Sequence, residues 1–403
     1  MRTLRKFIPQ RLVNTFKHRP NAALANLRYY FPSRKLIVIG VTGTDGKTTT
    51  VNMIYQILKA AGKRVSMVST INAVVGGKVY DTGFHVTSPS SNMIQRFLRQ
   101  SVKNKDEIMV LEVTSHALDQ HRFTGIKFDI GVVTNITHEH LDYHKTFENY
   151  SRSKAKLIKR AKVAVLNRDD VSFDKLSKLA SGKVVSFGST KLSNFNPLKF
   201  PLKLKMPGVF NILNGLAASA VCVELGVDSK LIKKTLENLE PLPGRMEPVE
   251  NSLGIKIIID FAHTPNGLIN ALKALRTQAS PGRLIAVIGA EGFRDIGKRV
   301  MMGESAMELA DTVVVTAVDP RGQLNEINQM IREGAMQAGA KEGENFFEIE
   351  DRKKAIEYAI KLAKKGDIVG IFGKGHETSI NLDGKDEIPW SDREVVQWIL
   401  SSN

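Results

Sequence analysis

Residues 36–50, LIVIGVTGTDGKTTT, join an aliphatic run to a glycine-rich turn that ends in Lys47 and three threonines. The aliphatic run predicts a buried strand, and residues 49–61 have the periodicity of a helix. A turn between strand and helix points backbone N–H groups at phosphate oxygens, with the positive end of the helix dipole behind them. Lys47 would contact the outer phosphates and the Thr48 hydroxyl a Mg²⁺ ion. The stretch therefore predicts a nucleotide-binding loop of the shortened form GxxGKT, with Gly43 as its first glycine.

The rest of the chain alternates short β-branched runs with longer stretches of helical period. The runs outside the opening stretch occupy residues 65–70, 108–113, 130–134, 163–166, 255–260, 284–289, 313–318 and 368–372. Such alternation predicts an α/β protein in which helices cover both faces of mainly parallel sheets. The Pro-rich segment 241–244 is the best candidate for a boundary between domains. We therefore expect a basic extension at 1–35, a P-loop-type ATP-binding domain at 36–243, and a Rossmann-like α/β domain at 244–403.

Size and composition indicate a globular protein that stays in the cytoplasm. The chain has 403 residues, of which 42% are hydrophobic and 25% charged. It contains no run of the roughly 20 apolar residues that a membrane span needs, and its first residues lack the apolar block of a signal peptide. The single cysteine, Cys222, has no partner for an internal disulfide or a thiolate zinc site.

The formal charge of +17 predicts an anionic partner, which could be nucleic acid, a membrane surface or a phosphorylated small molecule. Residues 1–35 are basic throughout and contain no acid. Their loosely helical apolar spacing suits either an amphipathic helix on an anionic membrane or a helix packed on the next domain. Basic residues are not interleaved with aromatic residues as in a nucleic-acid-binding surface, so we expect no nucleic-acid partner.

Acidic and imidazole side chains follow two further predicted strands. Glu112 ends the run at 108–113, and His140 follows the run at 130–134. Because the carboxyl ends of parallel strands meet at the crevice where ligands bind, both side chains could reach a metal held by nucleotide phosphates. Mg²⁺ prefers oxygen ligands, so Glu112 and Thr48 are expected and a histidine is less usual.

Three segments resemble the Mur ligase family, in particular the branch that adds the third residue of the peptidoglycan stem peptide. They are GTDGKTTT at 43–50, EVTSHALDQHR at 112–122, and TNITHEHLDYH at 134–144 with Tyr150 and Lys154 behind it. The resemblance implies an ATP site formed by Gly43, Thr44, Asp45, Gly46, Lys47, Thr48 and Thr49. It also implies Mg²⁺ ligation by Thr48, Glu112, His140 and a carbamylated Lys154. Asp45 departs from the asparagine that is usual in the family.

The resemblance extends to the acceptor and to the second half of the chain. It implies that the muramyl peptide contacts Thr87, Ser88, Thr114, Gln120 and Arg122. It implies that Asn211 contacts adenine, that Arg245 in PGRME meets the γ-phosphate, and that Asp260 lies near the nucleotide after closure. The incoming amino acid would meet Asp319, Arg321, Gly373 and Glu377. Arg321 suits the distal carboxylate of diaminopimelate, whereas Asp319, in place of the usual asparagine, would also accept an ammonium group, so lysine stays open.

The implied activity is an ATP-dependent ligase that adds meso-diaminopimelate or L-lysine to a muramyl dipeptide through an acyl phosphate. Lys47, His140, Lys154, Arg245 and Asp260 would act in catalysis, and we expect a monomer. Family members carry a uridine-binding domain before the loop, which has no visible counterpart before Gly40. The alternative is therefore an enzyme of the same kind that acts on a lipid-linked or polyglutamate-type acceptor.

Overall fold

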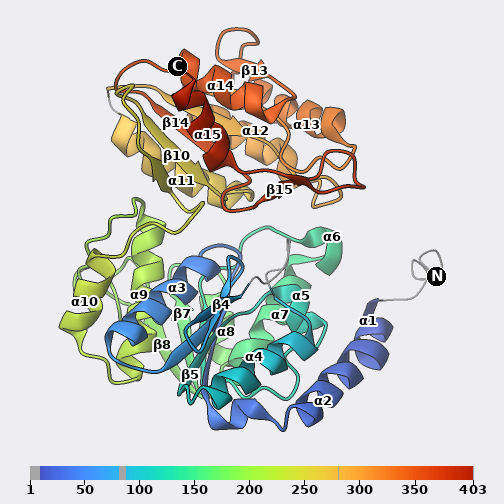
Figure 1. Ribbon diagram of the computed structural model, residues 1–403, viewed down its shortest axis with the longest axis vertical. Helices are drawn as coiled ribbons and strands as arrows, with labels where there is room; N and C mark the ends of the chain where they lie inside the picture. The colour runs from blue at the N-terminus through green and yellow to red at the C-terminus, as the bar shows by residue number, and fades with distance from the viewer. Residues whose placement is uncertain (1–9, 81–87, 280, 403) are drawn as a thin grey trace. The chain divides into compact units, whose positions relative to one another are not determined.

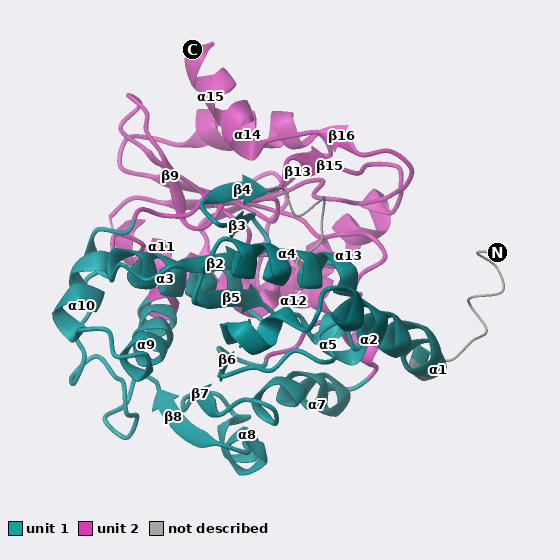
Figure 2. Ribbon diagram, turned by 60° about the horizontal axis from the view of Figure 1, so that its bottom comes forward, with its two compact units in different colours: residues 1–136, 146–204, 212–239 teal, residues 137–145, 205–211, 240–403 magenta. Residues whose placement is uncertain are grey.

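The computed structural model describes residues 10–80, 88–279 and 281–402 (Figure 1). Contacts divide the chain into two compact units, coloured in Figure 2 and described separately below. The first unit comprises residues 1–136, 146–204 and 212–239, and the second comprises 137–145, 205–211 and 240–403. The sequence pattern did not indicate that 137–145 and 205–211 group with the second unit. The predicted domain boundaries stay a prediction.

The first unit is built on an eight-stranded sheet of order β4-β3-β2-β5-β1-β6-β7-β8. The strands are β1 (Ile37–Thr42), β2 (Val65–Val68), β3 (Ala73–Val75), β4 (Lys78–Tyr80), β5 (Ile108–Glu112), β6 (Ile130–Val133), β7 (Val163–Asn167) and β8 (Lys183–Phe187). All neighbours from β2 to β8 are parallel, whereas β3 and β4 add an antiparallel edge. Because β1 lies between β5 and β6, the carboxyl ends of these three strands converge, as the alternating pattern predicted.

Helices surround this sheet and bury its aliphatic side chains. They are α1 (Gln10–Val13), the π-helical turn η2 (Asn14–His18), α2 (Arg19–Arg28), the 3₁₀ turn η3 (Pro32–Lys35), α3 (Lys47–Ala60), α4 (Ser91–Lys103), α5 (Ser115–Asp119), α7 (Phe147–Ile158), α8 (Phe173–Leu179), α9 (Val209–Glu224) and α10 (Ser229–Glu237). Phe97 and Leu98 of α4 pack with Val38 and Met109 in one core cluster. A Cβ at Gly40 would lie 2.7 Å from the Leu157 side chain, so this glycine lets α7 approach β1 closely.

The second unit contains a six-stranded sheet of order β13-β12-β11-β14-β10-β9, parallel except for β9. Its strands are β9 (Glu247–Val249), β10 (Lys256–Asp260), β11 (Leu284–Ile288), β12 (Thr312–Val315), β13 (Phe346–Glu348) and β14 (Ile368–Phe372), with a separate pair β15 (Ser379–Ile380) and β16 (Ile388–Pro389). Its helices are α6 (Leu141–His144), α11 (Pro265–Ala279), α12 (Lys298–Leu309), α13 (Leu324–Gln337), α14 (Arg352–Leu362) and α15 (Asp392–Ser401).

Successive strand residues in this sheet alternate between two cores. Ala286 and Ile288 of β11 pack in the cluster that includes residues of α11 and α12. Ile285 and Val287 pack in the other cluster, with residues of α14 and α15. Burial on both faces is what near-continuous aliphatic strands require. The predicted fold class, α/β with mainly parallel sheets, is confirmed.

The described part of the basic N-terminal segment forms helices that pack on the first unit. Asn26 of α2 is 2% exposed, and its amide donates to the carbonyl of Thr124 at 2.6 Å. Gln95 of α4 donates to the Asn26 side-chain oxygen at 3.1 Å. Packing of this segment on the next domain is therefore observed, and contact of its exposed side with an anionic membrane stays a prediction. No helix within the described ranges is both long and apolar enough to traverse a bilayer.

Candidate active site

The predicted phosphate loop connects β1 to α3 at the centre of the first sheet. Gly46 has a φ of 81° directly before α3, a conformation that favours glycine. A Cβ at Gly43 would lie 1.7 Å from the Thr134 hydroxyl, so the loop also needs glycine for close packing. The loop is therefore a tight turn that presents its backbone at the start of α3, as a phosphate site requires.

Side chains from outside the loop hold its shape. The Asn135 side-chain oxygen accepts from the backbone N–H of Thr44 at 3.2 Å and of Asp45 at 2.9 Å. The Thr134 hydroxyl donates to the Asp45 carbonyl at 2.6 Å. Neither residue was predicted to have a role, although both follow a predicted strand, which is a signal for a position at the carboxyl edge of the sheet. These contacts fix the loop before any ligand arrives.

Thr48 and Glu112 lie side by side at the carboxyl edge of the sheet. The Thr48 hydroxyl lies 3.1 and 3.0 Å from the two carboxylate oxygens of Glu112. Thr70, which was not predicted, donates to the same carboxylate through its backbone N–H and its hydroxyl, each at 2.8 Å. Glu112 is 2% exposed. A hydroxyl and a buried carboxylate in contact are hard oxygen donors of the kind that Mg²⁺ prefers, so these residues fit that ion.

Lys47 and Lys154 both reach the phosphate loop. The Lys47 ammonium donates to the Thr44 carbonyl at 2.8 Å. Lys154 of α7 is 1% exposed, and its ammonium donates to the Gly43 carbonyl and lies 4.4 Å from the centre of the Tyr150 ring. By local sequence alone Lys154 resembles a solvated surface lysine, whereas the fold buries it beside the loop. Its carbamylation stays a prediction.

The predicted acceptor residues form one cluster in the first unit. The Ser88 hydroxyl accepts from the N–H and the hydroxyl of Thr114, at 3.1 Å each, and donates to the Glu112 carbonyl at 3.2 Å. Arg122 donates to the Ser88 carbonyl and, through two nitrogens, to the Gln120 side-chain oxygen at 3.0 and 2.7 Å. Thr87, also predicted, lies outside the described residues.

His140 belongs to the second unit, so its predicted place at the metal stays a prediction. It has a φ of 59° at the start of α6, and its Nδ1 lies 3.7 Å from the Glu139 carboxylate. The Lys298 ammonium lies 3.4 Å from Glu139 and 3.7 Å from Glu291. Burial lowers the pKa of Lys298, but the two carboxylates outweigh it, so the pKa is raised and the lysine stays charged. This buried ion cluster was not predicted from the sequence.

Asp260 and Arg245 lie together in the second unit, at the end of β10. The Asp260 carboxylate accepts from the N–H groups of Met246 at 2.7 Å and Ala262 at 2.8 Å. Burial raises the pKa of Asp260, and Arg245 opposes that rise. The Arg245 guanidinium lies 4.5 Å from the centre of the Phe261 ring. Asp260 therefore fixes the turn that carries Arg245. Asn211, at the start of α9, donates to the Pro207 carbonyl at 2.7 Å.

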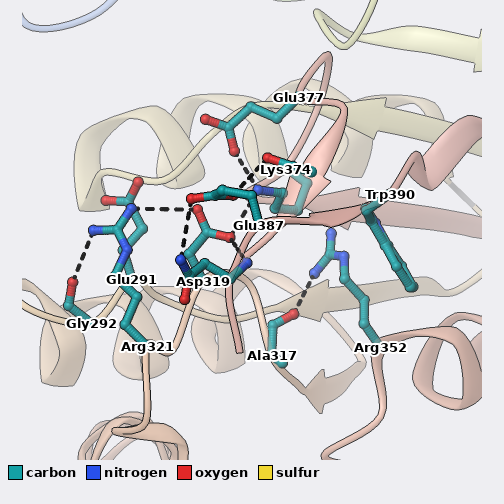
Figure 3. A network of polar contacts seen from close by, with 12 residues as sticks. Glu291, Gly292, Ala317, Asp319, Arg321, Arg352, Lys374, Glu377, Glu387 and Trp390 are labelled. Atoms are coloured by element: carbon teal, nitrogen blue, oxygen red, sulfur yellow. Dashed lines mark hydrogen bonds and ion pairs between the residues drawn. The ribbon is translucent and has the colours of Figure 1, made fainter. Parts of the chain in front are cut away.

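The predicted amino-acid residues meet beyond β12 and β14. Figure 3 shows the side chains of Asp319, Lys374 and Glu377 pointing toward one another. The Lys374 ammonium donates to Asp319 at 3.0 Å and to Glu377 at 2.6 Å. Asp319 is fully buried and also accepts from the backbone N–H of Asn381 at 2.9 Å. Asp319 was predicted to accept an incoming ammonium group. Lys374, which was not predicted to have a role, already forms an ion pair with this carboxylate.

Arg321 lies at the edge of the same cluster. Its guanidinium lies 3.7 Å from Asp319 and donates to the Gly292 carbonyl at 3.4 Å (Figure 3). Its side chain is 21% exposed, whereas those of Lys374 and Asp319 are fully buried. A Cβ at Gly373 would lie 2.9 Å from Val318, so this glycine allows the β14 end to pack tightly. Solvent or a substrate can therefore reach Arg321, whereas the Lys374 side chain is fully buried.

Comparisons with known proteins place both units in one family. The profile of the Mur ligase middle domain matches residues 41–222, and that of the Mur ligase glutamate ligase domain matches residues 244–375. A UDP-N-acetylmuramoyl-L-alanyl-D-glutamate--2,6-diaminopimelate ligase from Geobacillus thermodenitrificans is 37% identical over 94% of this chain and 82% of its own. A protein of the same name from Aquifex aeolicus is 37% identical over 92% of this chain and 79% of its own.

Solved structures agree with these sequence matches. A UDP-N-acetylmuramoyl-L-alanyl-D-glutamate--2,6-diaminopimelate ligase aligns with a TM-score of 0.61 at 29% identity, covering 91% of this chain and 78% of that one. A folylpolyglutamate synthase from Mycobacterium tuberculosis, solved with ADP and AMPPCP, aligns with a TM-score of 0.67 at 17% identity, covering 87% of this chain and 91% of that one. The second likeness concerns the fold alone.

Proposed function

This chain belongs to the Mur ligase family of ATP-dependent, amide-forming ligases, and we propose that it adds 2,6-diaminopimelate to a muramyl dipeptide in peptidoglycan synthesis. The relatives that match it over most of its length carry that activity in their names. The observation that carries the proposal is the contact between Thr48 and Glu112 beside the glycine loop. It joins a phosphate-binding turn to a hard-oxygen metal site, which is the apparatus of phosphoryl transfer.

The first half-reaction transfers the terminal phosphoryl group of ATP to a carboxylate of the acceptor. Backbone N–H groups of the loop at 43–48 and the Lys47 ammonium hold the phosphates, and the negative charge that develops on them is stabilised there. The acceptor carboxylate attacks the γ-phosphorus, the bond to the β-phosphate oxygen breaks, and ADP leaves. The product is an acyl phosphate, which the amine then attacks, releasing inorganic phosphate and forming the amide.

Thr48 and Glu112 are the residues that would hold Mg²⁺ in the first unit, with a carbamylated Lys154 as a further oxygen donor. When bound, the ion supplies positive charge at the phosphate oxygens. Ser88, Thr114, Gln120 and Arg122 would position the acceptor, because their hydrogen bonds run directly from Arg122 to the Glu112 backbone. His140, Arg245, Asp260 and Asn211 keep the roles that the family resemblance implies.

Diaminopimelate is favoured over lysine by the charges around Asp319. The buried Asp319 carboxylate already pairs with Lys374, whereas the Arg321 guanidinium is partly exposed. The distal end of lysine has only an ammonium group, which would meet Arg321 as a like charge, while the distal end of diaminopimelate also has a carboxylate, which gains a charge-assisted hydrogen bond from Arg321. We therefore expect the enzyme to select an amino acid that ends in a carboxylate.

The experiment is to follow phosphate release and product mass with UDP-linked muramyl dipeptide as acceptor, using diaminopimelate, lysine and ornithine in turn. Acceptor labelled with ¹⁸O in its carboxylates should pass one labelled oxygen to the released phosphate. Product without ¹⁸O in phosphate would exclude the acyl phosphate. Equal kcat/KM for lysine and diaminopimelate would refute the assignment of Arg321.

The described N-terminal helices also support a proposal of peripheral contact with an anionic membrane by a monomeric, cytoplasmic enzyme. Phe16 is 75% exposed and Leu27 62% exposed, in a segment rich in arginine and lysine. Exposed apolar side chains among basic residues suit an anionic lipid surface. Co-sedimentation with vesicles that contain anionic lipid, but not with neutral vesicles, is the expected result, and Phe16→Ser with Leu27→Ser should reduce it.

A further inference from the structure

A pocket of about 630 Å³ opens in the first unit between α2 and the first turn of α4. Its polar lining comprises His18, Asn21, Arg28, Ser91, Asn92 and Arg122. Three of these residues are basic types, and of the described residues that line the pocket none is acidic. The volume lies in the range of small-molecule sites and exceeds what a single inorganic ion fills.

The wall formed by α2 is fixed in place. The Asn26 side chain bonds Thr124, Ala22 and Gln95 at the same time, at 2.6, 2.8 and 3.1 Å. A Cβ at Gly125 would lie 2.6 Å from the Asn26 amide, so this glycine lets the helix pack closely. Asn14, one turn before α2, donates to Asp119 at 2.7 Å. The pocket is therefore preformed, which reduces the entropy lost when a ligand binds.

The opposite wall favours negative charge. Ser90 caps α4 by accepting from the Met93 N–H, and the first turn of this helix contains no acidic residue. The backbone N–H groups of Ser91 and Asn92 stand at the positive end of the helix dipole, beside Arg122. The start of α4 and the Arg122 guanidinium thus both favour an anion at this wall.

A chain of hydrogen bonds connects the pocket to the phosphate-loop site. Arg122 lines the pocket and donates to the Ser88 carbonyl. The Ser88 hydroxyl donates to the Glu112 carbonyl, and the Glu112 carboxylate contacts Thr48. A ligand group in the pocket is therefore adjacent to the residues that would position the acceptor, so the pocket is placed to hold another part of that same molecule.

We propose that this pocket binds a diphosphate group carried by the acceptor, with Arg28, Arg122 and the start of α4 as its ligands. The proposal rests on the proposed function in taking the acceptor to be a muramyl peptide. A sugar diphosphate can carry a nucleoside or a lipid on its far side, and the pocket chemistry recognises what both share. Asn21 and His18 supply further polar contacts along the α2 wall.

The first test compares Arg28→Ser with Arg19→Ser, which removes the same charge from an exposed position of α2 outside the pocket lining. We expect Arg28→Ser to raise the KM for the diphosphate-bearing acceptor about tenfold, the loss of one charge-assisted bond, with kcat and the KM for ATP unchanged. Arg19→Ser should change the acceptor KM less than twofold. With muramyl dipeptide that lacks phosphate, Arg28→Ser and the wild type should have equal KM values. An equal effect of both substitutions, or an Arg28 effect that persists without phosphate, overturns the proposal.

UDP-linked and lipid-linked acceptors form the two arms that identify the source of the diphosphate. Because both acceptors carry the diphosphate, the KM should depend on Arg28 in both arms, and the acceptor with the higher wild-type kcat/KM identifies the source. If neither arm shows this dependence, the pocket does not hold the acceptor.

A binding measurement separates failure of the pocket from failure of the proposed function. Inorganic pyrophosphate is titrated by calorimetry into the full chain with saturating Mg²⁺ and ADP, which fill the phosphate loop. We expect the wild type and Arg19→Ser to bind pyrophosphate equally well and Arg28→Ser to bind it at least fivefold more weakly. This result supports the pocket even if no muramyl acceptor is ligated. Affinities that are equal in the three proteins, or no binding at all, overturn it.

Discussion

The phosphate loop of the first unit and the amino-acid cluster of the second stabilise buried polar groups by different means. Around the loop, no carboxylate is part of the contacts described above: the Asn135 oxygen accepts from the Asp45 N–H, the Thr134 hydroxyl donates to the Asp45 carbonyl, and the ammonium groups of Lys47 and Lys154 donate to backbone carbonyls. Around Asp319, the stabilising contacts are ion pairs, in which Lys374 lies between two carboxylates with no solvent exposure of its own.

The difference follows from what each site has to accept. A loop that receives phosphate gains from uncharged donors, because a fixed carboxylate aimed at the phosphates would repel them. A site that distinguishes between charged amino-acid side chains needs fixed charges, and a buried charge is tolerated only when it is paired. We therefore expect the two regions to respond differently to single substitutions.

The largest effect should come from the charge of Glu112, whose carboxylate contacts Thr48. Glu112→Gln keeps an acceptor for Thr70 but removes the negative charge, and we expect kcat to fall about a thousandfold, as loss of a metal ligand in a phosphoryl-transfer site implies. Phosphate release measures this directly. Glu107→Gln, at the exposed start of the same strand, is the control and should keep full activity. A Glu112→Gln enzyme with a tenth or more of wild-type kcat would exclude the metal site.

The second effect should separate the two regions by stability. Lys374→Met removes the buried ammonium that lies between Asp319 and Glu377 and leaves the partly exposed Arg321, 3.7 Å away, as the cation near Asp319, which should cost about 3–5 kcal/mol of unfolding free energy. Asn135→Ala, at the loop, should cost about 1–2 kcal/mol because only neutral bonds are lost. Both tryptophans, Trp390 and Trp398, lie in the second unit, so their fluorescence in urea reports on the Lys374 change. Circular dichroism follows the Asn135 variant.

A rescue variant tests whether charge is the cause of that loss. Adding Asp319→Asn to Lys374→Met removes one of the two carboxylates that lose the lysine and should recover part of the stability. If the double variant is as unstable as the single one, packing of the lysine chain, not charge, accounts for the loss.

Most of the fold could be predicted from local sequence because its signals are local. The run at 368–372 was predicted as a strand and forms β14 with the same ends, and the run at 108–113 differs from β5 by one residue. Aliphatic runs between helical stretches leave few alternatives to parallel sheets. The glycines of the loop were recognised for the same reason, since strand, turn and helix are contiguous in the chain.

Contacts between distant segments were not predictable from residue pattern alone. Lys154 lies in a basic helix and is distinguished only by the fold, which places it at Gly43. Asn135 and Lys374 act on groups 90 and 55 residues away in the chain. No local periodicity encodes such pairs, so they emerged only from the tertiary structure.

The third effect concerns Lys154 and the charge it carries in the active enzyme. If the lysine is carbamylated, it contributes a carboxylate, and Lys154→Ala should lower kcat about a hundredfold, with partial recovery when a short carboxylate such as formate or acetate is added. Lys159→Ala, at the exposed end of the same helix, is the control. Equal loss with and without added carboxylate would indicate that the amine itself is used, as its bond to the Gly43 carbonyl would allow.

The smallest effect is the pH dependence that His376 gives to the second unit. Burial, and after it the charge of Arg245, lowers the pKa of this histidine to about 3. An unfolded histidine titrates near pH 6.5, so between about 6.5 and 3 the unfolded chain binds a proton that the folded unit does not. The stability of the unit therefore decreases as the pH falls through this window.

His376→Gln removes this proton uptake, and the comparison with wild type isolates it from other titrating groups. For each unit by which the pH falls between 6 and 4.5, the wild type should lose about 1.4 kcal/mol of unfolding free energy relative to the variant. Tryptophan fluorescence in urea at several pH values measures it. The phosphate loop offers no matching effect, since the side chains described as bonding its backbone are asparagine, threonine and lysine, which do not titrate in this range. A parallel pH dependence of variant and wild type would mean that His376 binds a proton as readily in the folded unit as in the unfolded chain, and would contradict the lowered pKa.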